Sequence, residues 1–338
     1  MKISYISRPY STDGLFALSI RLVVGWTYFS AFWRRLVLEN KLIPDEPGYI
    51  GEKFNHFLPN ALGIKPLIEY LVTHPEALWW AMVIFTIVEG FVGLFMILGL
   101  FTRLMSVGVF ALAMGILLGS GWLGTTCLDE WQIGILGIAS GFTLFLSGSS
   151  IYSLDNFFVQ KDFPFTRSRW FPWLGSGSLP VKDLKPFVLW GSAFIFLMTL
   201  FTNQYFHGGV VGTLHNKSIK PLIEIKDVSL LNNSLQFEVY RTEGVDVYGS
   251  FLIGIKLSDV TGKTVFEMNG EDLARLSPAQ ISNKYVTKIK PGKHSLVIPL
   301  GAKGVINLDL KNDGISDNAT YLLTLTDISG AEWKEKVN

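Results

Sequence analysis

Hydrophobic residues form five long runs in the first 202 residues of the chain. The runs are Gly14–Trp33, Ala77–Phe101, Leu104–Trp122, Trp131–Leu146 and Phe187–Thr202. A helix needs about 20 mostly apolar residues to cross a bilayer, so each run is predicted to be a membrane span, the last two with flanking residues included. The first run is interpreted as a retained span rather than a cleaved signal, because Arg21 interrupts it and no A-x-A site follows.

The pattern changes after residue 205, where apolar and polar residues alternate in short runs such as SLQFEVYR and TYLLTLTD. Short alternating runs between turn residues are typical of an antiparallel β-sandwich. A D-x-[ST]-G pattern recurs at residues 259–262 and 327–330 and predicts two hairpin turns. The N-x-[ST] sequons lie only in this part, at Asn216, Asn232 and Asn318, as expected of a domain outside the membrane.

These patterns predict an α-helical membrane bundle joined to a β domain, in four consecutive parts. Residues 1–158 form a four-helix membrane domain and residues 159–185 an inner linker. Residues 186–204 form a fifth transmembrane helix, and residues 205–338 an extracytoplasmic all-β sandwich. The linker mixes aromatic, basic, proline and glycine residues, which favours a segment lying on the membrane surface.

Composition agrees with a membrane protein and excludes some classes. The chain is 49% hydrophobic and only 17% charged, far from the usage of a soluble domain. A net charge of +1 gives no case for a nucleic-acid surface. The single cysteine excludes an iron–sulfur cluster held by cysteines of this chain alone. His56 and His74 match no metal-binding spacing and are interpreted as surface residues.

Basic residues and tryptophans set the expected orientation. Segments predicted to be inside carry Lys2, Arg8, Arg103, Lys161, Arg167, Arg169, Lys182 and Lys185, while the outer loop 123–130 has no base and the outer loop 34–76 carries five bases and six acids. The tryptophans at positions 33, 79, 80, 122 and 131 fall at outer span ends, as an interfacial belt requires. We expect a multi-pass plasma-membrane protein with a cytoplasmic N-terminus and an extracytoplasmic C-terminal domain.

Two charged residues lie deep in the predicted spans. Counting from the span ends places Arg21 ~10 Å and Glu89 ~12 Å from the inner edge of the bilayer. The matching depth predicts an ion pair, since an unpaired charge in a membrane is costly. Such a pair either fixes the helix bundle or forms a polar site for a quinone head group or its protons, and both interpretations stay open.

The only cysteine lies in the stretch TTCLDEWQ between two predicted spans. Thr126 and Asp129 match a capping box, which puts Cys127 at the first position of a helix, where a thiol's pKa falls and anions are attracted. Asp129 and Glu130 oppose both effects, while Arg34 and Arg35 end the first span on the same side and suit oxyanions such as sulfonate. The alternatives are a packing residue for Cys127 and interfacial anchors for the arginines.

A family resemblance rests on these same residues. Residues 14–158, with the arginine in SIRLVVGWTYFSAFWRR and the glutamate in FTIVEGFVGLFMILGLFTR, resemble the DoxX-like superfamily and more closely DoxD, taken here as the large subunit of thiosulfate:quinone oxidoreductase. Residues 186–338, with HGGVVGTLHNKSIKP leading into the β region, resemble its partner DoxA. The order DoxD then DoxA is the more specific part of the resemblance, and here the two are fused in one chain.

The resemblance implies an enzyme that oxidises two thiosulfates to tetrathionate at the outer face, passes electrons to membrane quinone, and needs no flavin, haem or metal. In the mechanism we expect, the Cys127 thiolate adds to the quinone, and thiosulfate sulfur then attacks the cysteine sulfur, expelling quinol and leaving Cys–S–S–SO3. A second thiosulfate then displaces tetrathionate. Arg34 and Arg35 would bind sulfonates, Asp129 or Glu130 would move protons, and Arg21 with Glu89 would serve the quinone.

Two other classes remain open at this point. One is a non-catalytic membrane scaffold whose outer β domain binds partners, and the other is a quinone-linked oxidoreductase of a different sulfur compound. Whether the chain assembles as a homodimer is also left open.

Overall fold

The computed structural model describes residues 12–121, 129–231, 233–245, 249–310 and 319–337. The chain divides into two compact units. Unit 1 consists of Met1–Glu46, Trp80–Leu117 and Trp131–Tyr205, and unit 2 consists of Pro47–Trp79, Leu118–Glu130 and Phe206–Asn338. Within the described residues, unit 1 is helical, and unit 2 holds three short helical segments from the first half of the chain together with the β-strands.

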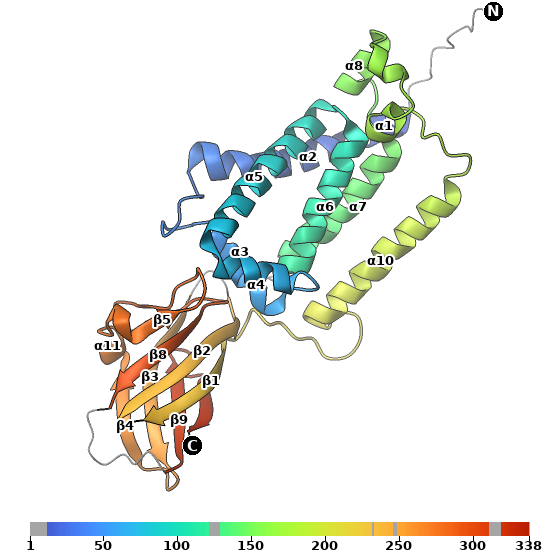
Figure 1. Ribbon diagram of the computed structural model, residues 1–338. Coiled ribbons are helices and arrows are strands. Elements are labelled where there is room, and N and C mark those ends of the chain that lie inside the picture. Colours follow the sequence, from blue (N-terminus) through green and yellow to red (C-terminus); the bar gives the residue numbers. More distant parts are fainter. Residues whose placement is uncertain (1–11, 122–128, 232, 246–248, 311–318, 338) are drawn as a thin grey trace, which may run out of the picture. The chain divides into compact units, whose positions relative to one another are not determined.

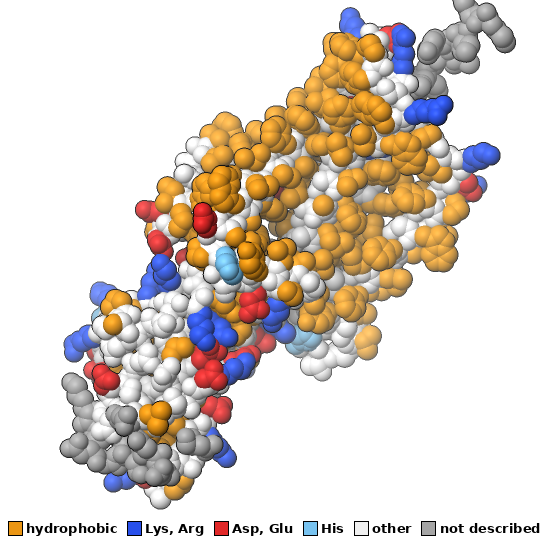
Figure 2. All heavy atoms as spheres, viewed as in Figure 1, with side chains coloured by type: hydrophobic (Ala, Val, Ile, Leu, Met, Phe, Trp, Pro, Cys, Tyr) orange, Lys and Arg blue, Asp and Glu red, His pale blue; other side chains and the backbone are white. Residues whose placement is uncertain are grey.

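The helices of unit 1 follow the apolar runs of the sequence. They are α1 (Thr12–Phe16), α2 (Leu18–Phe32), the π-helical turn η1 (Trp33–Leu38), α5 (Pro75–Leu98), α6 (Thr102–Ser120), α7 (Asp129–Ser147), α8 (Leu154–Gln160), η3 (Pro164–Arg167), α9 (Phe171–Leu174) and α10 (Lys185–His207). Three of them, α5, α6 and α10, are long and apolar enough to cross a membrane. Figure 2 shows apolar side chains dominating the visible surface over the long helices. The predicted total of five spans stays a prediction.

Glycines lie where neighbouring helices of unit 1 approach closely; the helices are labelled in Figure 1. A Cβ at Gly25 of α2 would lie 2.9 Å from the Ile97 nitrogen of α5, and one at Gly108 of α6 would lie 2.7 Å from Val92 of α5. On α7, a Cβ at Gly137 would lie 2.7 Å from Ala113 of α6. Small residues at such crossings let helix backbones approach closely. Gly25, Gly108 and Gly137 are therefore packing residues of α2, α6 and α7.

The linker between α7 and α10 is tied to the start of α6 by buried polar contacts. The Asp155 carboxylate of α8 accepts hydrogen bonds from the backbone nitrogens of Phe101 and Thr102, at 2.8 and 3.0 Å, and so caps α6. The Arg103 guanidinium, 1% exposed, donates to the carbonyl oxygens of Pro172 at 2.6 Å and Gly177 at 2.7 Å. The linker is thus packed against unit 1 through defined contacts.

The β domain of unit 2 consists of two antiparallel sheets around one core. Its strands are β1 (Leu222–Leu231), β2 (Ser234–Glu243), β3 (Ser250–Asp259), β4 (Thr264–Asn269), β5 (Ile281–Asn283), β6 (Lys290–Pro291), β7 (Leu296–Ile298), β8 (Lys303–Asp309), β9 (Tyr321–Asp327) and β10 (Glu332–Val337), with the short helical segments α11 (Gly270–Leu273) and η4 (Pro278–Gln280). One sheet has the order β1-β2-β8-β5, and the other the order β10-β9-β3-β7-β6 with β4 on β3. Inward residues such as Phe237, Ile255 and Leu323 are fully buried between them. The predicted all-β region is confirmed.

Both D-x-[ST]-G segments form the hairpin turns that the sequence predicts. The Asp259 carboxylate accepts from the backbone nitrogens of Thr261 and Lys263, each at 2.9 Å, between β3 and β4. The glycines at the ends of the two motifs, Gly262 and Gly330, have φ angles of +84° and +82°. These left-handed conformations suit glycine, which explains the motif.

Three short helical segments from the first half of the chain belong to the same unit as the β domain. They are α3 (Gly51–Phe57), η2 (Leu58–Asn60) and α4 (Lys65–Thr73). Leu58, Ile68 and Val72 are buried in a cluster that includes Tyr285 and Val286 of the β domain. The predicted outer loop 34–76 is therefore partly an ordered helical element.

Candidate functional site

A buried ion pair joins the end of the first long helix to the middle of α5. Glu89 of α5 is 3% exposed, and its carboxylate pairs with the Arg35 guanidinium of η1. The Arg35 carbon Cζ lies 5.8 Å from the centre of the Phe85 ring, which adds a cation–π contact. A carboxylate among apolar helices needs such a cation, because an uncompensated buried charge is strongly destabilising.

Two buried residues with hydroxyl groups lie on the helices that carry this pair: Thr86 on α5, and Tyr28 on α2, which continues into η1. Thr86, one helical turn before Glu89, is 1% exposed, and its hydroxyl has no hydrogen-bond partner among the described residues. The Tyr28 hydroxyl, on α2, lies 3.5 Å from the Val109 carbonyl oxygen of α6. Arg35, Glu89, Thr86 and Tyr28 are named the polar cluster here. It combines a carboxylate, the guanidinium paired with it and two hydroxyls among apolar helices.

The prediction that Arg21 contacts Glu89 is wrong. The Arg21 nitrogen Nη2 donates instead to the Tyr152 carbonyl oxygen at 2.5 Å, and its Nη1 lies 2.7 Å from where a Cβ at Gly99 would be. Gly99 is ten residues beyond Glu89, or about 15 Å along a helix. Arg21 therefore lies near the other end of α5.

The reason is the register of α2 against α5. Gly25 lies against Ile97, and Gly90 lies against Phe32, so the two helices run antiparallel with a fixed pairing. This pairing puts Glu89 opposite the start of η1, where Arg35 is available. Counting residues from the ends of the apolar runs pairs Glu89 with Arg21 instead, because the ends of the two runs do not lie at the same level in the helix bundle.

The remaining predicted site residues are described only in part. Arg34 is exposed, and its Nε donates to the Ser30 carbonyl oxygen at 3.3 Å. Helix α7 begins at Asp129, with the half-buried Glu130 next to it. Cys127 and the capping residue Thr126 lie outside the described residues, as does the Asp129 side chain. The proposed constellation of these residues with the arginines is therefore not tested and stays a prediction.

Sequence reasoning identified Arg35 and Glu89 but missed Thr86 and Tyr28. A signal for both was present. Arg21, Tyr28 and Arg35 are spaced by seven residues and Thr86 and Glu89 by three, which places each set on one face of a helix. Polar side chains repeated on one face of an apolar helix indicate a face turned toward other helices rather than lipid.

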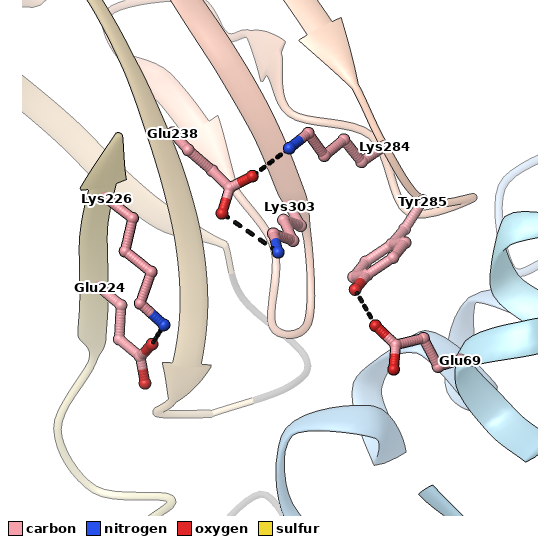
Figure 3. Close-up of polar contacts among 7 residues, drawn as sticks. All are labelled: Glu69, Glu224, Lys226, Glu238, Lys284, Tyr285 and Lys303. Atoms are coloured by element: carbon pink, nitrogen blue, oxygen red, sulfur yellow. Dashed lines mark hydrogen bonds and ion pairs between the residues drawn. The ribbon is translucent and has the colours of Figure 1, made fainter. Parts of the chain in front are cut away.

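Unit 2 has a second buried carboxylate, drawn in Figure 3. Glu238 of β2 pairs with Lys284, and its other oxygen lies 3.1 Å from the Lys303 nitrogen of β8. Burial alone would raise the pKa of Glu238, but the two lysines outweigh burial and lower it below its ordinary value. This arrangement links β2 to β8 and to Lys284, the residue that follows β5, on the outer face of one sheet. No group of three or more histidine, cysteine or acidic residues is placed to hold a metal ion within the described parts of the chain.

Comparison with protein families divides the chain in the same way as its composition. Residues 16–182 match the family described as "TQO small subunit DoxD", where TQO is thiosulfate:quinone oxidoreductase. Residues 206–336 match the family described as "TQO small subunit DoxA". The chain therefore belongs to the DoxD and DoxA families, fused in one polypeptide. Both descriptions say small subunit, so the expectation of DoxD as the large subunit is not supported.

Proposed function

We propose that this chain is a membrane thiosulfate:quinone oxidoreductase. Two thiosulfates, one quinone and two protons give one tetrathionate and one quinol, and the charges balance at −2 on each side. The observation that carries the proposal is the presence of both subunit families of this enzyme in one chain. The apolar helices α5, α6 and α10 support a location in the membrane, where the quinone is dissolved.

The polar cluster is proposed as the quinone end of the enzyme. Quinone, a second substrate here, needs a hydrogen-bond donor for its carbonyl oxygen and a proton source when it is reduced. The Thr86 hydroxyl is buried and unpaired within the described residues, so it is available as a donor. Glu89 would carry the proton, with Arg35 holding its carboxylate in place.

Arg21 is proposed to act in proton transfer rather than in binding the quinone ring. Its Nε and Nη1 are buried without hydrogen-bond partners within the described residues. It lies at the C-terminal end of α5, about 15 Å along the helix from Glu89, so it would act on protons arriving from that end rather than on the quinone ring directly.

Sulfur chemistry is proposed for Cys127 at the outer surface. In the first step, its thiolate and one proton add to the quinone. In the second, thiosulfate sulfur attacks the cysteine sulfur, takes the place of the quinol, which leaves with a second proton, and forms Cys–S–S–SO3⁻. In the third, the terminal sulfur of a second thiosulfate attacks the sulfane sulfur that is bonded to the cysteine sulfur, so that the cysteine leaves as the restored thiolate and tetrathionate is formed.

Nearby charges would serve these steps. Asp129 and Glu130 would move the two protons, and arginine would bind the sulfonates. Arg34 is the better candidate for the sulfonate, because it is exposed while Arg35 is engaged by Glu89. This scheme requires the N-terminus inside and the β domain outside, as the distribution of Lys and Arg predicts.

The test uses the purified full chain in detergent with thiosulfate and a soluble quinone analogue. We expect bleaching of the quinone with formation of one tetrathionate per quinol. Cys127→Ala and Cys127→Ser should both lose turnover, since neither side chain can form the sulfur–sulfur bond with thiosulfate. Thiosulfate should also protect the wild-type thiol from alkylation.

The controls distinguish a failure of the proposed activity from a failure of the proposed covalent mechanism. Each variant must elute as wild type does in size exclusion, so that loss of turnover is not loss of fold. Near-normal turnover by Cys127→Ala would reject the covalent scheme but keep the enzyme. No turnover by the intact wild-type chain would reject the enzyme and favour a membrane scaffold.

A further inference from the structure

The helical segment 51–73 and the β domain are held together by contacts that cross the boundary between the two families. The segment lies inside the DoxD match, residues 16–182, and the β domain inside the DoxA match, residues 206–336. Both belong to the same compact unit. Residues 183–205, which connect the two matched regions along the chain, lie outside both matches.

Asn55 of α3 is the centre of this contact. It is 0% exposed, and its side-chain nitrogen donates to the Gly301 carbonyl oxygen. Its side-chain oxygen accepts from the Thr287 nitrogen at 3.1 Å. One buried amide thus forms hydrogen bonds with two separate β-domain loops, accepting from one and donating to the other. The contact therefore depends on the spacing of the two loops as well as on their polarity.

Gly301 shows how closely the two surfaces fit. Its φ angle is +74°, and a Cβ at this position would overlap the Asn55 carbonyl oxygen. The turn that carries Gly301 is held in place by two backbone hydrogen bonds with Arg241, from Gly301 N to Arg241 O at 2.9 Å and from Arg241 N to Ala302 O at 3.1 Å. Glycine is therefore needed here both for the backbone conformation and for the neighbour.

The second β-domain loop, residues 284–289, contacts the same helical segment 51–73. The Asn283 side chain closes residues 284–289 into a loop through two hydrogen bonds with Ile289, at 2.7 and 3.1 Å. At its tip, the Tyr285 hydroxyl donates to the Glu69 carboxylate at 3.0 Å, as Figure 3 shows. Tyr285 and Val286 also pack against the buried Leu58, Ile68 and Val72.

A further polar bridge lies beside these contacts. The Asn60 side-chain nitrogen donates to the Thr242 carbonyl oxygen at 3.0 Å, and Lys217 donates to the Asn60 side-chain oxygen at 3.1 Å. The contact therefore combines a buried apolar cluster with hydrogen-bonded polar side chains, as protein–protein interfaces do.

We propose that residues 51–73 are a docking platform for a β domain of the DoxA type, able to hold that domain without a covalent connection. The partner that fits it is a separate β-sandwich chain presenting a glycine turn and an aromatic loop at the spacing of Gly301 and Tyr285. This interaction does not depend on the catalytic scheme.

The test cuts the connection in the full chain. A site for a specific protease is inserted after Gly212, where Val211 and Leu214 are 74% and 75% exposed. After cutting in detergent, fragment 213–338 of the wild-type sequence should co-elute with the membrane fragment. Separation of the two wild-type fragments would overturn the proposal.

Matched variants identify the contact that holds them. Gly301→Ala should weaken the association about tenfold or more, since it displaces Asn55 and leaves buried polar groups unpaired. Gly262→Ala is the control, because Gly262 has a similar φ of +84° but no atom within 4 Å of the added Cβ. Asn55→Ala should release a β domain of unchanged sequence, with Asn156→Ala on α8 as its control. If Gly301→Ala and Asn55→Ala remain as tightly bound as their controls, the platform is elsewhere and the proposal fails.

Discussion

Glu89 and Glu238 are equally buried, at 3% exposed each, yet their surroundings differ in kind. Glu89 lies on an apolar helix and pairs with one arginine, whose side chain is 21% exposed. Glu238 lies on a sheet face and pairs with two lysines, whose side chains are 45% and 26% exposed. The first carboxylate has a single cation inside a bundle, and the second has two that reach water.

The difference indicates different roles for the same side chain. Two solvated lysines hold Glu238 charged and connect β2 to β8 and to the residue that follows β5. Glu89 has one fixed partner and a buried, unpaired hydroxyl one turn away. Intramembrane carboxylates of this kind are retained for function more often than for stability.

The largest expected effect is a difference in quinone-reduction rate between variants of the two carboxylates. Glu89→Gln should lower quinone reduction about a hundredfold or more, because the amide keeps the shape but cannot carry the proton. Glu238→Gln should leave turnover within about twofold of wild type and lower the free energy of unfolding by about 1 kcal/mol. Steady-state rates of both purified variants check this. Equal rates for the two variants would remove the functional distinction.

A smaller effect tests which cation belongs to Glu89. In double-mutant cycles on unfolding in detergent, Arg35→Met and Glu89→Gln should show a coupling energy of about 2 kcal/mol, as residues in direct contact do. Arg21→Met and Glu89→Gln should add within about 0.5 kcal/mol. A larger coupling for Arg21 than for Arg35 would restore the pairing that span depths predict.

The sequence predicts much of the fold for identifiable reasons. Apolar runs mark the long helices, alternation marks the strands, and D-x-[ST]-G marks two turns that need a glycine at positive φ. The partner of Glu89 could not be predicted, because it depends on how glycines set the register of α2 against α5. The helical structure of segment 51–73 was not predicted either. Its helices are short and are stabilised by residues more than 200 positions away, as the Asn55–Gly301 contact shows.

The smallest expected effect is the pH dependence of the stability that Glu238 contributes to the β domain. Because the pKa of Glu238 is lowered in the folded chain, the folded state binds fewer protons than the unfolded state near pH 4. The stability that Glu238 contributes is therefore fully present above its ordinary pKa of 4.5 and is lost as pH falls through the lower, folded value. Melting of the full chain from pH 7 to pH 3 should show wild type above Glu238→Gln at neutral pH, with the gap closing below about pH 4. Glu224→Gln is the matched control on the same face, because Glu224 and its partner Lys226 are 38% and 58% exposed and water screens their attraction. A gap that persists at pH 3, or an equal gap for Glu224→Gln, would show that the two lysines do not stabilise the ionised Glu238 more than an exposed pair does.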